Sequence, residues 1–172
     1  VDCGNPCAKI CLPATIQQIA TSSEAKVLTL PSGLVDALFV LQNPNPDYAI
    51  KDLSYELKIY DASGAILKTI EGKSFIYGGE IKYVAEPAIN LSGSVAVRAE
   101  YEIKNLVWIK AENFAKTNLA VQSQGATILG DNIQVIGRVL NQDTATFPGV
   151  KIIAVISDDA GNQMGVSETQ IE

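Results

Sequence analysis

The chain has 172 residues, with 13 Lys or Arg, 19 Asp or Glu and no His, which gives a formal net charge of −6. Without histidine it can form no Ser-His-Asp triad, Cys-His dyad or HExxH zinc site, and we do not expect an enzyme. The acidic balance argues against a surface for nucleic acid or anionic membranes. Hydrophobic residues make up 47% of the chain, which predicts a globular fold with a core of its own.

All three cysteines lie within the first eleven residues, at Cys3, Cys7 and Cys11. An odd count leaves one thiol unpaired unless its partner lies upstream or on another chain. A zinc or iron–sulfur centre would need a fourth ligand and a different spacing, so we favour disulfides in an oxidising compartment. The chain begins at Val1 without an initiator Met or a signal peptide, and we expect a processed or cut product whose Cys-rich segment spans residues 1–14.

A polar stretch at residues 17–26 predicts either a linker or a first edge strand, and β-strand signals follow it. In residues 51–61, apolar side chains alternate with polar ones, which puts one face on a core and the other in water. Turn residues separate the apolar runs, and no segment keeps a helical period. The strands expected are residues 26–30, 34–41, 51–61, 65–70, 74–77, 81–84 and 94–104, and they predict a β-sandwich over residues 15–105.

The second half of the sequence repeats the first. Asn43 ends an apolar strand before a polar turn, as does Asn141, at an offset of 141 − 43 = 98. The turn that starts at Asp61 corresponds to the turn that starts at Asp158, at an offset of 158 − 61 = 97. An Asn, two turns and an alternating strand in the same order predict a tandem pair of sandwich units, the second at residues 106–172.

The second copy stops after its return strand at residues 163–171, whereas the first copy continues with at least two more strands. We therefore expect the second sandwich to lack its last strand or strands, with an open edge near Ile171. Three explanations stay open at this point. The chain was cut, further residues were not retained, or another chain supplies the strand by complementation.

Residues 57–61, Leu-Lys-Ile-Tyr-Asp, resemble the signature of the FxLYD domain, and residues 136–141 and 149–162 follow its outline in the second copy. The first copy, residues 38–77, resembles the water-stress type of late-embryogenesis-abundant-like domain through the pattern of residues 43–50 and 53–57. Together these resemblances span residues 26–172. They imply two tandem immunoglobulin- or fibronectin-III-like sandwiches without catalytic residues, although Ser157 stands where the FxLYD family usually has Tyr.

Residues 1–7, Val-Asp-Cys-Gly-Asn-Pro-Cys, resemble the tail of a Cys-rich segment found in bacterial surface proteins, with Asn5 in place of a glycine and Cys11 one place late. This resemblance implies a secreted, cell-surface location, an N-terminal segment that cross-links or anchors, and contact with a membrane only through a lost anchor.

Candidate chemistry is sparse. Glu100 and Glu102 lie on the polar side of an alternating strand, which favours a solvated face over acid–base catalysis. The turn at Asp158 offers too few oxygens for calcium, and no cofactor or metal is expected. A Lys–Asn isopeptide cross-link stays open. Trp108 favours packing at the domain junction over sugar stacking.

The sequence thus predicts a non-catalytic structural protein of the bacterial cell surface or an extracellular assembly: a spacer, stalk or filament subunit whose partners include copies of itself. The alternative is an adhesion module that binds a polysaccharide or a protein. That alternative predicts an exposed aromatic patch, and the candidate partner contacts are Trp108, Tyr77, Tyr83 and Ile171.

Overall fold

The computed structural model describes residues 16–172 except residues 21, 131, 148 and 172. Its described residues are all-β, with antiparallel strands and a single short 3₁₀ turn, η1 (Ala111–Asn113). The strands are β1 (Ser22–Thr29), β2 (Val35–Gln42), β3 (Tyr48–Tyr60), β4 (Ile66–Ile76), β5 (Ile81–Ile89), β6 (Arg98–Lys110), β7 (Leu119–Leu129), β8 (Asn132–Asn141), β9 (Val150–Ser157) and β10 (Gln163–Ile171).

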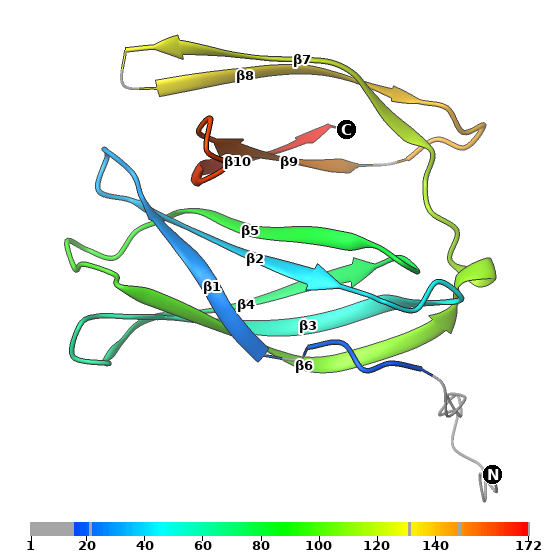
Figure 1. Ribbon diagram of the computed structural model, residues 1–172, viewed down its shortest axis with the longest axis horizontal. Coiled ribbons are helices and arrows are strands. Elements are labelled where there is room, and N and C mark those ends of the chain that lie inside the picture. Colours follow the sequence, from blue (N-terminus) through cyan, green and yellow to red (C-terminus); the bar gives the residue numbers. More distant parts are fainter. Residues whose placement is uncertain (1–15, 21, 131, 148, 172) are drawn as a thin grey trace, which may run out of the picture.

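Six strands form the first unit in the order β4-β3-β6-β1-β2-β5. The first half of β1 pairs with β6, from Ser22 to Ala25, and its second half pairs with β2, from Lys26 to Thr29. Figure 1 shows the consequence: β1 crosses from a layer that contains β3, β4 and β6 to a layer that contains β2 and β5. The unit is therefore a sandwich-like pair of layers linked by β1.

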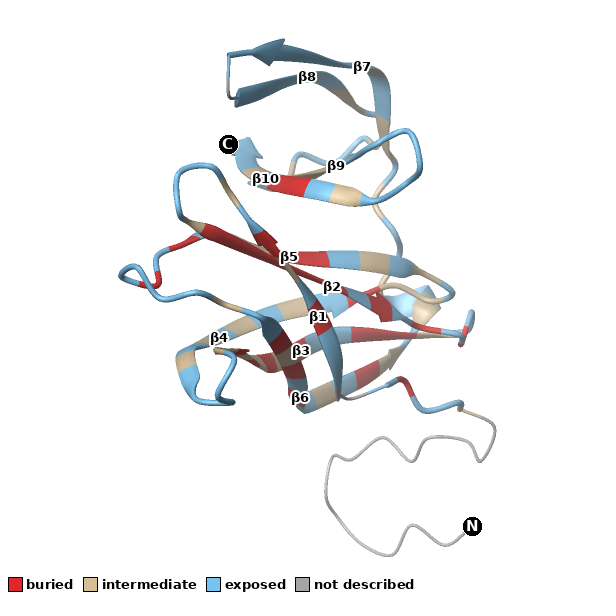
Figure 2. Cartoon of the chain, turned by 60° about the vertical axis from the view of Figure 1, so that its left-hand side comes forward, coloured by how far each residue is buried: buried red, intermediate tan, exposed pale blue. Residues whose placement is uncertain are grey.

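The core lies between these layers and follows the predicted alternation of β3. Leu53, Tyr55, Leu57 and Ile59 are buried, while Ser54, Glu56 and Lys58 between them are partly exposed. From the opposite layer, Phe39 of β2 stacks on Tyr101 of β6, with ring centroids 4.2 Å apart. Aromatic pairs of this kind add stability beyond the apolar area that they bury. Figure 2 shows the buried residues concentrated on these central strands.

Several strands are longer than the sequence predicted, and two of them change the predicted layout. The segments expected at residues 65–70 and 74–77 form one strand, β4, because Gly72 sits in register opposite Tyr55 and the pairing with β3 runs on. The strand expected at residues 94–104 begins at Arg98 and continues through Lys110. The predicted unit boundary after residue 105 therefore falls inside β6, and Trp108 pairs with Ile50 in the first unit.

The remaining strands form two separate hairpins, β7–β8 and β9–β10. The β9–β10 hairpin packs on the outer face of β2 and β5, where Leu38, Ala85 and Val166 are buried together. The carboxylate of Asp36 joins the two parts, because it accepts hydrogen bonds from the backbone N–H of Ala88 at 2.9 Å and of Val166 at 3.1 Å. The β7–β8 hairpin lies beyond β9–β10 (Figure 1).

The turn hydrogen bonds of the first unit recur in the second. The side chain of Asp61 accepts from the N–H groups two and four residues later, and that of Asp158 does the same. Asn43 accepts from the N–H of Asn45, as Asn141 does from that of Asp143. β7–β10 thus repeat the turn chemistry of β1–β4.

The two asparagines differ in burial, and this difference yields a stability prediction. Asn43 is 1% exposed and donates to the carbonyls of Tyr48 (2.7 Å) and Tyr77 (2.9 Å), whereas Asn141 is exposed and donates only to that of Ala145. Asn43→Ala should lower the free energy of unfolding by about 1–3 kcal/mol, because it removes a buried side chain that donates to two part-buried carbonyls and accepts from the N–H of Asn45. Asn141→Ala, the matched control, should cost less than about 1 kcal/mol. Urea unfolding measures both, and equal losses would contradict the difference in burial.

Candidate functional site

An apolar-lined groove of about 460 Å³ lies between the sandwich and the β9–β10 hairpin. Its first-unit wall comes from β4 and β5, and its second wall comes from the starts of β7 and β9 together with β10. The aromatic and charged side chains that line the groove are Phe75, Tyr77, Tyr83, Phe147, Lys73, Lys82, Lys116, Lys151, Glu80 and Glu168. Four lysines against two glutamates make the groove locally positive in a chain of net charge −6.

Lys82 and Lys73 are the two groove lysines without an ion pair among the described residues, and Lys82 is the more informative. Its Nζ lies 3.3 Å from the ring centroid of Phe75, a cation–π arrangement. No described carboxylate lies within ion-pair distance of it, whereas Lys116 reaches Glu80 at 3.6 Å and Lys151 reaches Glu168 at 2.8 Å. Burial lowers the pKa of Lys82 to about 8, although the charge of Glu80 acts in the opposite direction. A bound anion would stabilise the charged form of this amine.

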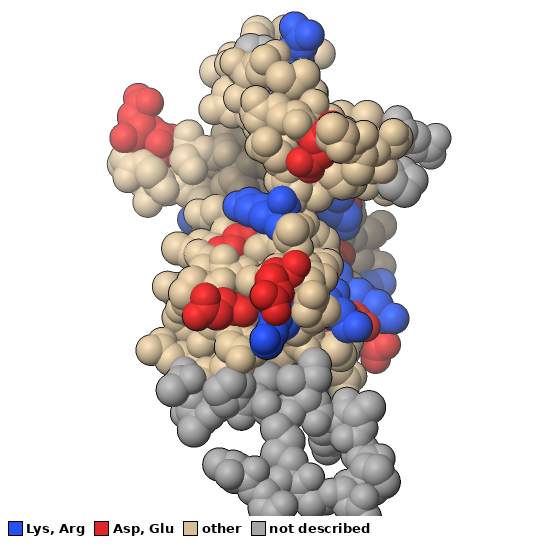
Figure 3. All heavy atoms as spheres, turned by 90° about the vertical axis from the view of Figure 1, so that its right-hand side faces the viewer, with Lys and Arg blue, Asp and Glu red and all other residues tan. Residues whose placement is uncertain are grey.

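Figure 3 views the molecule from the side on which the chain passes from β6 to β7. Lys or Arg side chains lie at the level where the sandwich meets the two hairpins. This is the level of the groove, whose walls come from both parts. Asp or Glu side chains lie next to them, so this face carries both signs of charge (Figure 3).

Aromatic rings line the first-unit side of the groove. Phe75 and Tyr77 meet edge to face with centroids 5.3 Å apart, and Tyr83 is 42% exposed. Tyr77 and Tyr83, two of the residues predicted from sequence as partner contacts, thus lie together. Trp108 is 7% exposed and packs in the core, so it presents no open face.

Tyr55 closes the floor of the groove. Its ring lies over Gly72, where a Cβ would come within 2.2 Å of it, so only glycine fits there. Its hydroxyl donates to Oε1 of Glu86 at 2.5 Å, and burial raises the pKa of the phenol. On the opposite wall, Oε2 of Glu168 is buried without a hydrogen-bond partner among the described residues. A ligand hydroxyl would satisfy that oxygen.

A second feature is the exposed inner face of the second unit. By the offset of 98, Val35 and Ala37 of β2 correspond to Ile133 and Val135 of β8. The first pair is 2% and 0% exposed, whereas the second pair is 43% and 40% exposed. Figure 2 shows the β7–β8 hairpin exposed along its length. Exposed apolar faces of this kind are typical of interaction surfaces.

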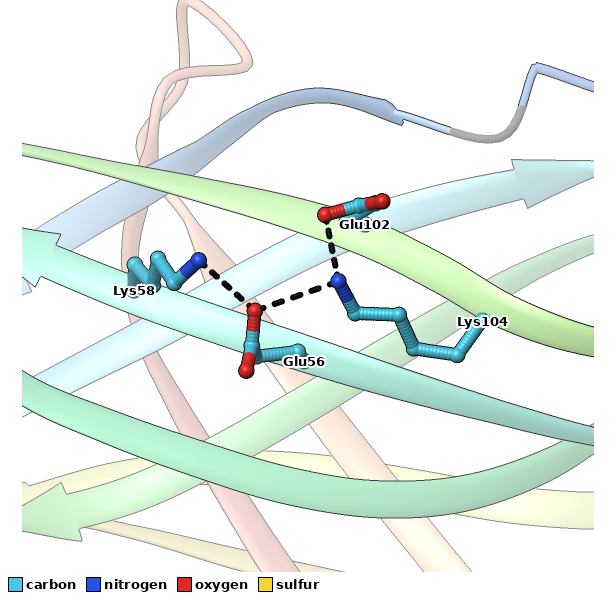
Figure 4. Close-up of polar contacts among 4 residues, drawn as sticks. All are labelled: Glu56, Lys58, Glu102 and Lys104. Atoms are coloured by element: carbon cyan, nitrogen blue, oxygen red, sulfur yellow. Dashed lines mark hydrogen bonds and ion pairs between the residues drawn. The ribbon is translucent and has the colours of Figure 1, made fainter.

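The carboxylates of the alternating strands face solvent and form ion pairs. Figure 4 shows Glu56 between Lys58 and Lys104, at 2.7 and 3.3 Å, and Lys104 bound to Glu102 at 2.5 Å. The hydrogen bond from Lys58 lowers the pKa of Glu56, which is the opposite of what a general acid needs. Arg98 pairs with Glu100 in the same way.

The other predicted positions are placed as follows. Ile171, at the end of β10, is 49% exposed. Cys3, Cys7 and Cys11 lie outside the described residues.

Over the part of the chain that the structure describes, no group of three or more acidic or cysteine side chains could hold a metal. In that same part, no helix is long and apolar enough to cross a membrane.

The comparisons with known proteins add no relative: no family model, no curated protein and no solved structure matches the chain. The resemblances to the FxLYD and water-stress domains therefore stay predictions, and the function has to be argued from the geometry. Sequence reasoning missed the groove lysines, because they come from four separate segments and share no motif.

The lowered pKa of Lys82 makes stability depend on pH. The unfolded chain keeps this amine protonated up to a pKa near 10.5, while the folded chain releases the proton near 8. Below pH 8 the folded state contains a buried charged amine, which lowers its stability. Between pH 8 and pH 10.5 the folded chain loses this charge while the unfolded chain keeps it, so the free energy of unfolding rises with pH. Relative to Lys82→Met, the wild type should gain stability across this window. Urea unfolding at several pH values measures the gain, with Lys68→Met on the exposed face of β4 as control, and a flat difference would contradict the assignment.

Proposed function

We propose that this chain is a non-catalytic structural protein of a bacterial cell surface or an extracellular assembly, acting as a spacer, stalk or filament subunit. In this proposal the six strands of the first unit form a complete immunoglobulin- or fibronectin-III-like sandwich. β7–β10 belong to a second such unit, and strand complementation by a neighbouring chain would cover its inner face.

The observation that carries the proposal is a difference in solvent exposure between equivalent positions of the two repeats. The first-unit positions, Val35 and Ala37, are buried in the core that β2 shares with β3 and β6, whereas their counterparts Ile133 and Val135 are 43% and 40% exposed. The turn hydrogen bonds show that the local fold of the second unit is intact. Exposing apolar side chains to water costs free energy in proportion to their area, so covering them would drive association. The surface location rests on the Cys-rich resemblance of residues 1–7.

Covalent footprinting by oxidation tests this proposal in native material. In the isolated chain, hydroxyl radicals should label Ile133 and Val135 readily, because both side chains are exposed. In intact envelopes or extracellular fibres, labelling of these two residues should fall at least about tenfold, since a partner would exclude solvent from them. Ile66, 53% exposed next to the Asp61 turn, is the matched control and should label equally in both samples. Equal labelling of all three in native material would contradict an assembly through this face.

The groove favours a second candidate, an adhesion module for an acidic polysaccharide. Lys82 lacks a carboxylate partner among the described residues, Tyr83 offers an exposed ring, and Oε2 of Glu168 lacks a donor. Carboxylates, sugar faces and hydroxyls are the groups that would satisfy these three features. A uronic acid oligosaccharide carries all of them.

Binding of oligogalacturonate tests this candidate. The sugar should shift the NMR signals of Lys82 and Tyr83 and raise the pKa of Lys82 above about 8, because its carboxylate stabilises the ammonium form. Lys82→Met should weaken binding about tenfold, whereas Lys68→Met should not change it. A neutral oligosaccharide of the same length is the ligand control. Equal binding of both sugars, or none of either, would contradict recognition by the groove lysines.

A further inference from the structure

The groove between the two units opens onto the free edge of β5. Among the described strands, β5 is the last of the six-strand order and pairs only with β2. Residues 82–85 of β5 are consecutive, and all of them line the groove. Because consecutive side chains of a strand point to opposite faces, a hollow that touches all of these residues must lie beside the edge of the strand. Residues 73–75 of β4, the other edge strand of the first unit, line the groove in the same way.

Alternate residues of β5 direct their backbone polar groups toward this groove. The backbone N–H of Asn43 donates to the carbonyl of Glu80 at 2.9 Å, which makes these two residues a hydrogen-bonded pair in the register of β2 and β5. Hydrogen-bonded and non-hydrogen-bonded pairs alternate along an antiparallel ladder. Lys82 therefore bonds to β2, whereas the N–H and C=O groups of Tyr83 and Ala85 point away from it. In the described part of the chain, no strand lies beside β5 to pair with them.

We propose that the groove binds an extended segment of a partner polypeptide, which pairs antiparallel with the free edge of β5. The segment places a carboxylate opposite Lys82 and apolar side chains opposite Ile81 and Tyr83. This inference goes beyond the proposed structural function, because it concerns an edge of the first unit and does not depend on the exposed face of β7–β8. It also gives the groove a polypeptide ligand in place of the acidic sugar.

The backbone geometry favours a polypeptide. Residues two apart on a strand, such as Tyr83 and Ala85, present their backbone groups at a repeat of about 6.4–6.8 Å, which is also the repeat of a second strand. Addition of a strand to an exposed sheet edge is a recurring mode of peptide recognition for this reason. Every strand pair among the described residues is antiparallel, and this arrangement is the more stable one per residue.

The carboxylate follows from the unpaired lysines of the groove. Nζ of Lys82 lies over the ring of Phe75 on β4, so this amine sits between the two edge strands. Both glutamates that line the groove already pair with other lysines, at 3.6 and 2.8 Å. Lys82 and Lys73 have no ion-pair partner among the described residues. A carboxylate on the segment would complement their charge.

The apolar side chains follow from the opposite face of β5. Ile81 and Tyr83 are 62% and 42% exposed, and Val40, in register with Tyr83 on β2, is 41% exposed. Lys82 lies between Ile81 and Tyr83 in the chain and points to the other face. Side chains on neighbouring strands line up on the same face, so the segment should bury apolar side chains beside Ile81 and Tyr83. The order apolar–acidic–apolar results.

The described strands of a second copy offer no free edge with this order. β7, β8 and β9 contain no Asp or Glu. The one carboxylate of β10, Glu168, already pairs with Lys151. In β4 the acidic residue is followed by Gly72, which has no side chain to bury, and in β5 it is followed by Pro87, which has no N–H to donate. The partner should therefore differ in sequence from these strands.

NMR titration of the full chain with the peptide acetyl-Thr-Thr-Val-Glu-Val-Thr-Thr-amide tests the pairing. The amide signals of Tyr83 and Ala85 should shift saturably, because both N–H groups gain an acceptor. Methylating the backbone nitrogens of both valines should weaken binding at least about tenfold, since these N–H groups face β5. Methylating the nitrogen of the glutamate, whose N–H points away from β5, is the matched control and should change binding less than about threefold. Equal weakening by the two modifications, or no binding of the unmodified peptide, would overturn the inference.

A double-mutant cycle tests the ion pair. Lys82→Met should weaken peptide binding about fivefold or more, whereas Lys68→Met, on the exposed face of β4, should leave it within about twofold. Replacing the glutamate of the peptide by glutamine should weaken binding to the wild type by a similar factor. The same replacement should not weaken binding to Lys82→Met further, because the pair is already broken there. Equal losses in both proteins would contradict a contact between the carboxylate and Lys82.

Two results would identify another occupant. Saturable binding of oligogalacturonate without binding of the peptide would make the groove a sugar site and overturn the inference. Self-association of the full chain that shifts the amide signals of Tyr83 and Ala85 would identify a second copy as the occupant and overturn the choice of a different partner. Neither result depends on the oxidative labelling of Ile133 and Val135, so failure of this inference is distinguishable from failure of the structural function.

Discussion

The double pairing of β6 is the constraint on which the rest of this structure depends. One strand hydrogen-bonds to β3 on one side and to the first half of β1 on the other. β1 then crosses to pair with β2, so that the backbone connects both layers and the core closes between them. Without such a strand, the same hairpin chemistry in β7–β10 yields two separate sheets with a partly exposed inner face. A β-sandwich needs its joining strand because hairpins alone bury too little apolar surface.

The junction between the two units explains why the repeat is imperfect. Glu56 and Lys58 of β3 face solvent and pair with each other, whereas their counterparts at the offset of 97, Ile153 and Val155, are apolar. Ile153 and Val155 pack against the buried cluster of Leu38, Ala85 and Val166 on the outer face of β2 and β5. The face of β9 that corresponds to the solvent-exposed face of β3 is thus the surface through which the second unit contacts the first. The junction leaves the lysine-rich groove beside it, where charge from both units faces one hollow.

The groove lies where the two units meet, so its charge comes from both of them. Lys82, whose amine lies on Phe75, and Lys73 have no ion-pair partner among the described residues, whereas Lys116 and Lys151 each pair with a glutamate. An anionic ligand in the groove would therefore meet two cations that no described carboxylate neutralises.

The sequence by itself determined the all-β class, the alternation of β3 and the repeat positions of the turns. These properties are local: a period of two and an Asp or Asn before a tight turn act within a few residues. Sequence reasoning also placed Tyr77 and Tyr83 among the contact candidates. It divided β4 in two and ended β6 too early, because the length of a strand depends on its neighbours: pairing with β3 carries β4 past Gly72 and β6 as far as Lys110.

Only the tertiary structure decided that Trp108 packs in the core, that Asp36 ties the second hairpin to the first unit, and that four distant lysines share one groove. The physical reason is that burial and charge clustering arise between segments far apart in the chain. Asp36 and Val166 are 130 residues apart, and no local pattern announces their hydrogen bond.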